Sequence, residues 1–439
     1  MIGSARFDAI RGRLLWFEAD PVLAGEGEAV RYVEDGLLVL RDGRIESVGE
    51  AGALLKALPA GARIADYRPY LVMPGFIDPH LHMPQTQVIA SYGAHLLEWL
   101  EKYTFVEEQR YADAGVAAAA SRFLLDELLR SGTTSAAVYC SVHPASAEAL
   151  FSQGEARGMR LVAGKVMMDR AAPAALLDTP QKGYDETKAL IARWHERGRL
   201  SYAITPRFAV TSSEAQLEAA GALAAEYPGM HIQTHLSENQ EEIETVARDF
   251  PWSEDYTAVY ERYGLVRKKA LFGHCIHLSP RERQALGEAG AAAIACPTSN
   301  LFLGSGLFDL VAMRRSEPPV RVGLATDIGG GTSYSMLQTA AAFYKVLALK
   351  DERLTPFEAF HMLTLGNAEA LGLEGRIGTF RPRVEADLVV LDNRATPAMA
   401  QRMERVETLF EELFVLMMMG DDRSVAATCL MGAEAYRRP

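Results

Sequence analysis

The nine residues PGFIDPHLH, Pro74–His82, end a short apolar run with two histidines that are separated by one leucine. Alternate side chains of a β-strand point to the same face, so His80 and His82 project side by side where the strand ends. Two imidazoles in this arrangement suit a transition metal that is gripped from two points. Taken alone, the pair is also compatible with histidines that cap a strand through hydrogen bonds.

Seven further apolar runs follow, and helical patterns lie between them, for example over Tyr111–Ser131 and Ser213–Tyr227. Eight strand–helix units predict an α/β protein with a (β/α)8 TIM barrel. In that fold the reactive side chains lie at the carboxyl ends of the strands. The eight predicted strands are Val72–His80, Gly132–Cys140, Arg160–Met168, Leu200–Phe208, His231–Glu238, Ala270–Leu278, Ala292–Asn300 and Val322–Ile328.

Both ends of the chain have β character. Gly36–Glu50 holds an Asp-Gly turn between two β-rich runs, which predicts a hairpin, and Arg376–Asp392 ends in the buried-strand pattern DLVVLD. We expect a small β-sandwich domain built from both termini, residues 1–72 and 374–439, around a barrel of residues 73–373. Leu413–Gly420, LFVLMMMG, predicts a buried C-terminal helix because it is far too short to span a membrane.

The 439-residue chain is 49% hydrophobic and 23% charged, an ordinary globular composition. Its 45 Lys and Arg against 57 Asp and Glu give a net charge of −12, which disfavours binding to nucleic acid or to an anionic membrane. The four cysteines form no CxxC pair, Met1–Asp20 lacks the apolar core of a signal peptide, and no apolar run approaches a membrane span. These features predict a cytoplasmic protein that acts on a small, uncharged or cationic molecule.

Further candidate metal ligands and proton carriers fall at the ends of three later strands. His235 ends the fifth strand and Glu238 follows in its loop, His274 ends the sixth strand, and Asp327 ends the eighth. A third histidine with nearby carboxylates supplies what metal-assisted hydrolysis needs, since the metal acidifies water and the carboxylates move protons.

Three neighbouring features are interpreted as structural. His231 begins its strand, far from the reactive end, and Cys275 reads as a small core residue. Gly329–Gly331 lacks the spacing of a phosphate-binding loop, which favours a tight turn.

The combination of HxH on the first strand, histidines on the fifth and sixth, and an aspartate on the eighth resembles the amidohydrolase superfamily. Members with two metals often use a carboxylated lysine at the end of the fourth strand. Here that strand ends in Pro206-Arg207-Phe208, and Lys165 on the third strand is a poor substitute. The resemblance therefore implies the one-metal, deaminase-type branch.

Within that branch the chain resembles the guanine deaminase family. The matching stretches are PGFIDPHLHMPQ, YGAHLLEWLEKYTF, GKVMMDR, ITPRF, THLSEN, CPTSNLFLGSG and ATDIGGGTSYSMLQT. The resemblance implies hydrolysis of guanine to xanthine and ammonia, one zinc ion per chain, and a homodimer. The first motif departs from the family at Pro79, where threonine is usual, so a backbone N–H is lost while every ligand is kept.

The resemblance also assigns roles to residues by position. It assigns zinc to His80, His82, His235 and Asp327; catalysis to Glu238, His274 and Asp327; and substrate binding to His82, Gln85, Arg207, Phe208, His235, Glu238, His274 and Asp327.

The pocket residues also suit a flat, neutral ring on their own chemistry. Arg207 can donate to a carbonyl oxygen, Gln85 can donate and accept at a ring nitrogen, and Phe208 either lies near the ring or packs in the core. Other rings stay open as substrates, among them 8-oxoguanine, cytosine and triazines, as does an inactive scaffold of the same fold. The H-x-E and P-C-x-x-C signature of the other zinc deaminase class is absent.

Overall fold

The predicted apolar runs form one parallel, barrel-like sheet in the computed structural model, which describes residues 6–93 and 95–439. Its order is β13-β12-β11-β10-β9-β7-β6-β5, with the short β8 paired to β9, so the prediction of a TIM-like barrel is confirmed. The strands are β5 (Phe76–His82), β6 (Thr133–Tyr139), β7 (Arg160–Gly164), β8 (Val166–Met167), β9 (Leu200–Pro206), β10 (His231–Leu236), β11 (Ala270–His274), β12 (Ala292–Ala295) and β13 (Arg321–Leu324).

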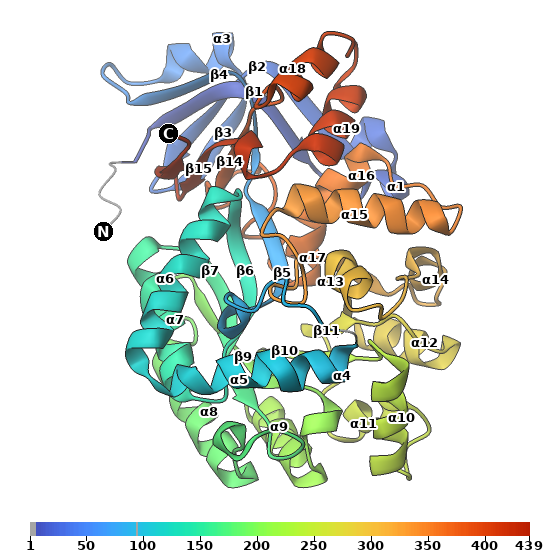
Figure 1. Ribbon diagram of the computed structural model, residues 1–439. Coiled ribbons are helices and arrows are strands. Elements are labelled where there is room, and N and C mark those ends of the chain that lie inside the picture. The colour runs from blue at the N-terminus through green and yellow to red at the C-terminus, as the bar shows by residue number, and fades with distance from the viewer. Residues whose placement is uncertain (1–5, 94) are drawn as a thin grey trace.

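Helices pack around the outside of this sheet (Figure 1). The two predicted helices are present as α6 and α9, and each begins after a residue whose side chain caps it: Asp113 accepts from Gly115 N and Val116 N, and Ser213 accepts from Gln216 N. The surrounding helices are α6 (Ala114–Arg130), α7 (Pro144–Arg157), α8 (Pro180–Trp194), α9 (Glu214–Glu226), α10 (Gln240–Asp249), α11 (Tyr256–Arg262), α12 (Pro280–Ala289), α13 (Pro297–Phe302), α14 (Leu310–Arg314), α15 (Met336–Leu349), α16 (Pro356–His361) and α17 (Asn367–Ala370).

The first and last strands of the barrel meet through side chains and loop backbone. Asn367 Nδ2 donates to Ile77 O at 2.7 Å and to Leu324 O at 2.8 Å, while its Oδ1 accepts from Leu324 N. Beyond the end of β13, Asp327 N donates to His80 O at 3.0 Å. These bonds hold the segment that carries Asp327 against the two histidines of β5.

The two termini build one β unit, as predicted, and its seven strands are hydrogen-bonded into a single mixed sheet above the barrel (Figure 1). The predicted hairpin turns at Asp42 and Gly43, whose φ angles of 54° and 77° suit a tight Asp-Gly turn. In the order β16-β15-β14-β4-β1-β2-β3, the strands are β1 (Ala9–Phe17), β2 (Val30–Arg41), β3 (Arg44–Glu50), β4 (Ile64–Pro74), β14 (Leu388–Leu391), β15 (Val425–Leu430) and β16 (Ala433–Arg437).

The remaining helices are short or lie near the C-terminus. The run Leu413–Gly420 lies largely in α19, where Leu413, Leu416 and Met417 are buried. Part of the Met1–Asp20 stretch, residues 1–5, lies outside the described residues. These helices are α1 (Pro21–Ala24), α2 (Glu26–Ala29), α3 (Ala51–Leu54), α4 (Leu96–Trp99), α5 (Phe105–Glu108), α18 (Pro397–Met403) and α19 (Leu409–Met419).

The first predicted strand, Val72–His80, is two strands. Its start belongs to β4 in the terminal sheet and its end to β5 in the barrel, and the chain crosses between them at Gly75. A Cβ on Gly75 would lie 2.3 Å from the side chain of Thr134, so the crossing needs a residue without a side chain. An apolar run gives no sign of this change of sheet, because both strands are buried.

A bulge in β5 accommodates Pro79. The pairing with β6 runs from Asp78 opposite Ala136 to Leu81 opposite Val138, so two residues of β5 face one of β6. Proline cannot donate to a ladder and is tolerated at such bulges. The proline at position 79 therefore does not interrupt the hydrogen bonding between β5 and β6.

Among the described residues, no helix combines the length and the hydrophobicity needed to cross a membrane. All four cysteines lie in the described part of the chain, and each is buried and free.

Candidate active site

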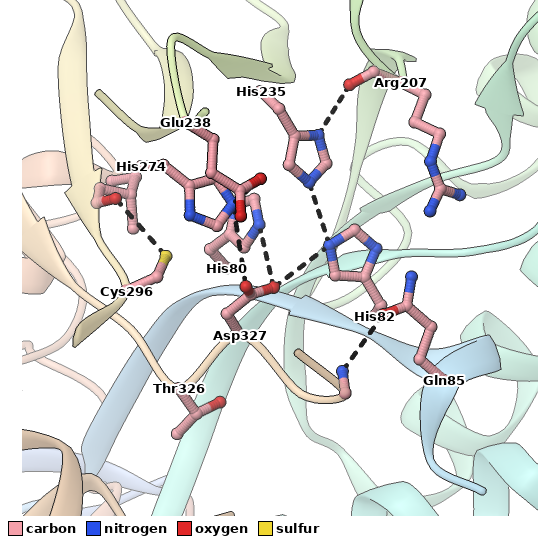
Figure 2. A network of polar contacts seen from close by, with 12 residues as sticks. His80, His82, Gln85, Arg207, His235, Glu238, His274, Cys296, Thr326 and Asp327 are labelled. Atoms are coloured by element: carbon pink, nitrogen blue, oxygen red, sulfur yellow. Dashed lines mark hydrogen bonds and ion pairs between the residues drawn. The ribbon is translucent and has the colours of Figure 1, made fainter. Parts of the chain in front are cut away.

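Four side chains converge at the carboxyl end of the barrel (Figure 2). His80 and His82 come from β5, His235 from β10 and Asp327 from the segment after β13. His82 Nε2 lies 3.1 Å from His235 Nε2 and 3.3 Å from Asp327 Oδ1, and His80 Nε2 lies 3.4 Å from the same oxygen. All four residues are buried.

This cluster fits a single metal ion. Ligand atoms about 2.0–2.1 Å from a tetrahedral zinc lie about 3.4 Å from one another, close to the spacings of 3.1–3.4 Å found here. Within the described residues, the buried Nδ1 and Nε2 of His80 make no hydrogen bond, which is unfavourable unless another group contacts them. Among the described residues, two groups of side chains could hold a metal ion, and both contain His80: His80, His82 and His235 form one, and His80, His274, Cys296 and Asp327 form the other.

The protonation of the cluster suits metal binding. Burial lowers the pKa of His82 to about 4 and holds the pKa of His235 well below its usual range, so both imidazoles are neutral. His235 Nδ1 donates to Arg207 O at 2.7 Å, which leaves the lone pair on Nε2. Burial opposes ionisation of Asp327, but the nearby imidazoles of His80 and His82 hold its pKa well below the usual range.

Glu238 and His274 line the other side of the cluster. His274 Nε2 lies 3.3 Å from Glu238 Oε2 and 3.8 Å from Asp327 Oδ2, and its Nδ1 lies 2.8 Å from Asn300 Oδ1. Burial, with the charge of Asp327, raises the pKa of Glu238 to about 8. At neutral pH Glu238 is therefore mostly protonated, and its carboxylic acid can donate a proton.

Two of these residues have unusual backbone conformations. The φ angles of His274 and Asp327 are 69° and 53°, in the left-handed region that non-glycine residues rarely adopt. Such strained positions gather at functional sites. A regular strand pattern does not reveal them.

Gln85 and Arg207 line the same cavity as His82 (Figure 2). Both are held by Glu108, a residue that the sequence analysis did not single out. Arg207 Nη1 donates to Glu108 Oε1 at 2.9 Å and Oε2 at 2.8 Å, and Gln85 Nε2 donates to Glu108 Oε1 at 3.1 Å. Gln85 Oε1 accepts from Gly329 N at 3.3 Å.

The walls of the cavity include a second set of residues that sequence analysis missed. Leu96 and Trp99 of α4 and Leu100 of the π-helical turn Leu100–Thr104 line it, together with Phe208 and Leu303. Their i, i+3, i+4 spacing was visible in the sequence, but a core helix has the same spacing. The cavity encloses about 380 Å³, counting the part that is open to solvent.

Two other candidates, His231 and Lys165, lie outside the cavity. His231 Nε2 bonds to Leu371 O at 2.7 Å, and Lys165 Nζ pairs with Asp178 at 2.5 Å in a separate buried cluster. Gly329–Gly331 forms the predicted tight turn, in which a Cβ on Gly331 would lie 1.8 Å from Thr326 O, and Gly330 of this turn lines the cavity.

Two cysteines lie close to the site without lining the cavity. Cys275 Sγ donates to Phe272 O at 3.4 Å. Cys296 lies near His80, His274 and Asp327, but burial raises the pKa of its thiol well above the usual range, so it is protonated and a poor ligand.

Comparisons with known proteins place this geometry in a family. The model of the amidohydrolase family matches residues 71–433. The chain therefore belongs to the amidohydrolase family.

The relatives that match this chain belong to one group within that family. The guanine deaminase of Escherichia coli strain K12 is 47% identical over 410 residues, 93% of each chain. The solved structure of E. coli guanine deaminase superposes with a TM-score of 0.96 at 46% identity, covering 99% of this chain and 100% of that one. Guanine deaminase from C. acetobutylicum, solved with guanine in its active site, gives a TM-score of 0.87 at 27% identity, covering 98% and 100%. These relatives place the chain among the guanine deaminases of its family.

Proposed function

We propose that this protein hydrolyses guanine to xanthine and ammonia, with one zinc ion held by His80, His82, His235 and Asp327. One observation carries the proposal: a single cavity joins this ligand cluster and Glu238 to the N–H donors of Arg207 and Gln85. The ligand cluster and Glu238 suit hydrolysis, and the donors of Arg207 and Gln85 suit a flat ring that carries a carbonyl oxygen. The similarity to guanine deaminases selects the ring.

Zinc bound at these four residues supplies Lewis acidity, which brings the pKa of water toward neutrality. Glu238 gives its proton to the ring nitrogen beside the attacked carbon and passes a water proton to the leaving amine. His274 Nδ1 donates to Asn300 Oδ1, so His274 Nε2 can donate to the oxygen that develops charge when the ring carries a proton on both nitrogens. A C–O bond forms and the C–N bond of the amine breaks, so one water is consumed for each ammonia released.

Three further properties belong to this proposal. The shared His80 of both ligand groups favours one ion per chain. The partly exposed Phe410 and Met419 of α19 offer an apolar contact for a homodimer. Four free, buried cysteines suit the reducing cytoplasm.

The test is an ammonia assay with guanine, adenine, cytosine and 8-oxoguanine on purified protein, with metal content measured in parallel. We expect ammonia from guanine, with far less from adenine, and about one zinc per chain. His82→Ala should lose most of the metal because three ligands remain. Ammonia from cytosine or 8-oxoguanine in place of guanine would reassign the substrate, and two metals per active chain would contradict the one-ion centre.

A further inference from the structure

Glu108 is the centre of a buried group of side-chain hydrogen bonds with Arg207 and Gln85. Its side chain is 1% exposed, and it receives two hydrogen bonds from Arg207 and one from Gln85. We propose that Glu108 is a positioning residue that sets the substrate class of the site by turning Arg207 and Gln85 into a fixed pair of hydrogen-bond donors. This inference rests on the proposed function.

The partners of Gln85 fix the orientation of its amide. A glutamine can face a ligand with its N–H or with its carbonyl oxygen. The Glu108 carboxylate only accepts, so it fixes Nε2 on its own side, and the N–H of Gly329 fixes Oε1 on the other. Gln85 therefore has one N–H left for a ligand, and its carbonyl oxygen is already used.

Arg207 is held in the same way, with donors left for a ligand. Its Nη1 is taken up by Glu108, whereas Nε and Nη2 make no hydrogen bond within the described residues. The Phe105 ring lies under the guanidinium, 5.5 Å from its carbon. Phe105 and Glu108 are three residues apart on α5 and so share one face of that helix. The helix thereby holds Arg207 by a ring and by a carboxylate.

The fixed donors determine which rings the site accepts. The donors of Arg207 and Gln85 require acceptors on the ligand, one a carbonyl oxygen and the other a ring nitrogen that carries no hydrogen. The Glu108 carboxylate also balances the charge of Arg207, so this side of the cavity has no net charge and suits an uncharged ring. The site therefore selects oxo-substituted rings over rings that lack the carbonyl.

The probe is 2-aminopurine, which carries the same leaving amine as guanine but no carbonyl oxygen. We compare kcat/KM for both substrates on the zinc-loaded enzyme with Glu108→Gln, whose side chain offers Gln85 a donor as well as an acceptor. We expect kcat/KM for guanine to fall at least roughly tenfold, chiefly through KM, while the value for 2-aminopurine changes little. Glu108→Asp, which keeps the charge, should retain part of the preference.

The matched control is Glu107→Gln, because Glu107 is the neighbouring residue and pairs with the half-exposed Arg110 at 2.8 Å. It should leave both substrates unchanged. An equal loss for guanine and 2-aminopurine in Glu108→Gln would show a merely structural role and overturn the inference.

Two further measurements keep the test decisive. Should Glu108→Gln fail to fold, the double variant Arg207→Met/Glu108→Gln removes both buried charges. The double variant should fold and no longer favour guanine over 2-aminopurine, and a retained preference overturns the inference.

If the parent releases no ammonia from guanine, the proposed function fails. The inference is then tested by the dissociation constants of guanine and 2-aminopurine, whose ratio Glu108→Gln must lower.

Discussion

Glu238 lies where a proton has to move, with Oε2 3.3 Å from His274 Nε2 and Oε1 accepting from the Ser305 hydroxyl at 3.1 Å. Glu238→Gln keeps the shape of this side chain but cannot transfer a proton. We expect kcat to fall by at least roughly a hundredfold, the scale of general acid–base catalysis, while zinc content stays normal.

A nearby glutamate provides the control for this variant. Glu241 is exposed at the start of α10, so Glu241→Gln should leave kcat unchanged. Full activity in Glu238→Gln would assign the proton transfer to another residue.

Gly273 decides whether His80 can reach the metal position. A Cβ on Gly273 would lie 2.5 Å from His80 Cε1, a distance that real side chains do not reach. Gly273→Ala should therefore push the imidazole out of place and weaken zinc binding by at least about tenfold, as changes beside a metal ligand commonly do.

The readout for Gly273→Ala is the zinc that remains after dialysis against a chelator. Gly52→Ala is the control because no atom lies within 4 Å of the added Cβ. Equal zinc retention in both variants would mean that His80 has room to move.

At the scale of elements, α17 closes the barrel. Asn367 makes three buried hydrogen bonds that join Ile77 of β5 to Leu324 of β13. Asn367→Ala leaves these backbone groups without partners, and each costs about 1–3 kcal/mol. We expect the free energy of unfolding in urea to fall by about 3 kcal/mol or more.

Asn367→Asp separates the two kinds of bond that this side chain makes. It keeps the acceptor for Leu324 N but loses both donors, so the loss of stability should remain large. A variant as stable as the parent would show that the junction is held by other contacts.

The elements also show why part of the site was predictable. Buried parallel strands are short apolar runs, and the polar residues that end them, such as His235 and Asp327, stand out against those runs. Glu108 and Trp99 come from short helices after β5, where an acidic or aromatic residue looks like any surface or core position. Their role depends on which side of the helix meets Arg207, and sequence spacing does not contain that information.

At the scale of the whole molecule, the terminal sheet is joined to the barrel by a buried ionic cluster. Arg160 begins β7 and Arg199 precedes β9, and both donate to Glu385 just before β14, at 2.9 and 2.7 Å. Arg199 also pairs with Asp387. Residues far apart in the chain thus fix the sheet above the barrel.

Glu385 makes this junction sensitive to acid. Burial alone would raise its pKa, but the hydrogen bonds from Arg160 and the charge of Arg199 lower it below the usual value. A carboxyl with a lowered pKa in the folded state stabilises the fold above its unfolded pKa of about 4.3, and that stability is lost as pH falls through the lower folded pKa. Glu385→Gln leaves two arginines short of their counter-charge and should cost about 3–5 kcal/mol at pH 7.

The measurement is the free energy of unfolding of parent and Glu385→Gln from pH 7 to pH 3. The difference in free energy of unfolding between parent and variant should be largest at pH 7 and should decrease below about pH 4.3, because acid removes from the parent the charge that the variant already lacks. Glu374→Gln, at an exposed position before the same strand, should follow the parent throughout. A constant gap across this range would mean that Glu385 stabilises the junction by packing and hydrogen bonding rather than by its charge.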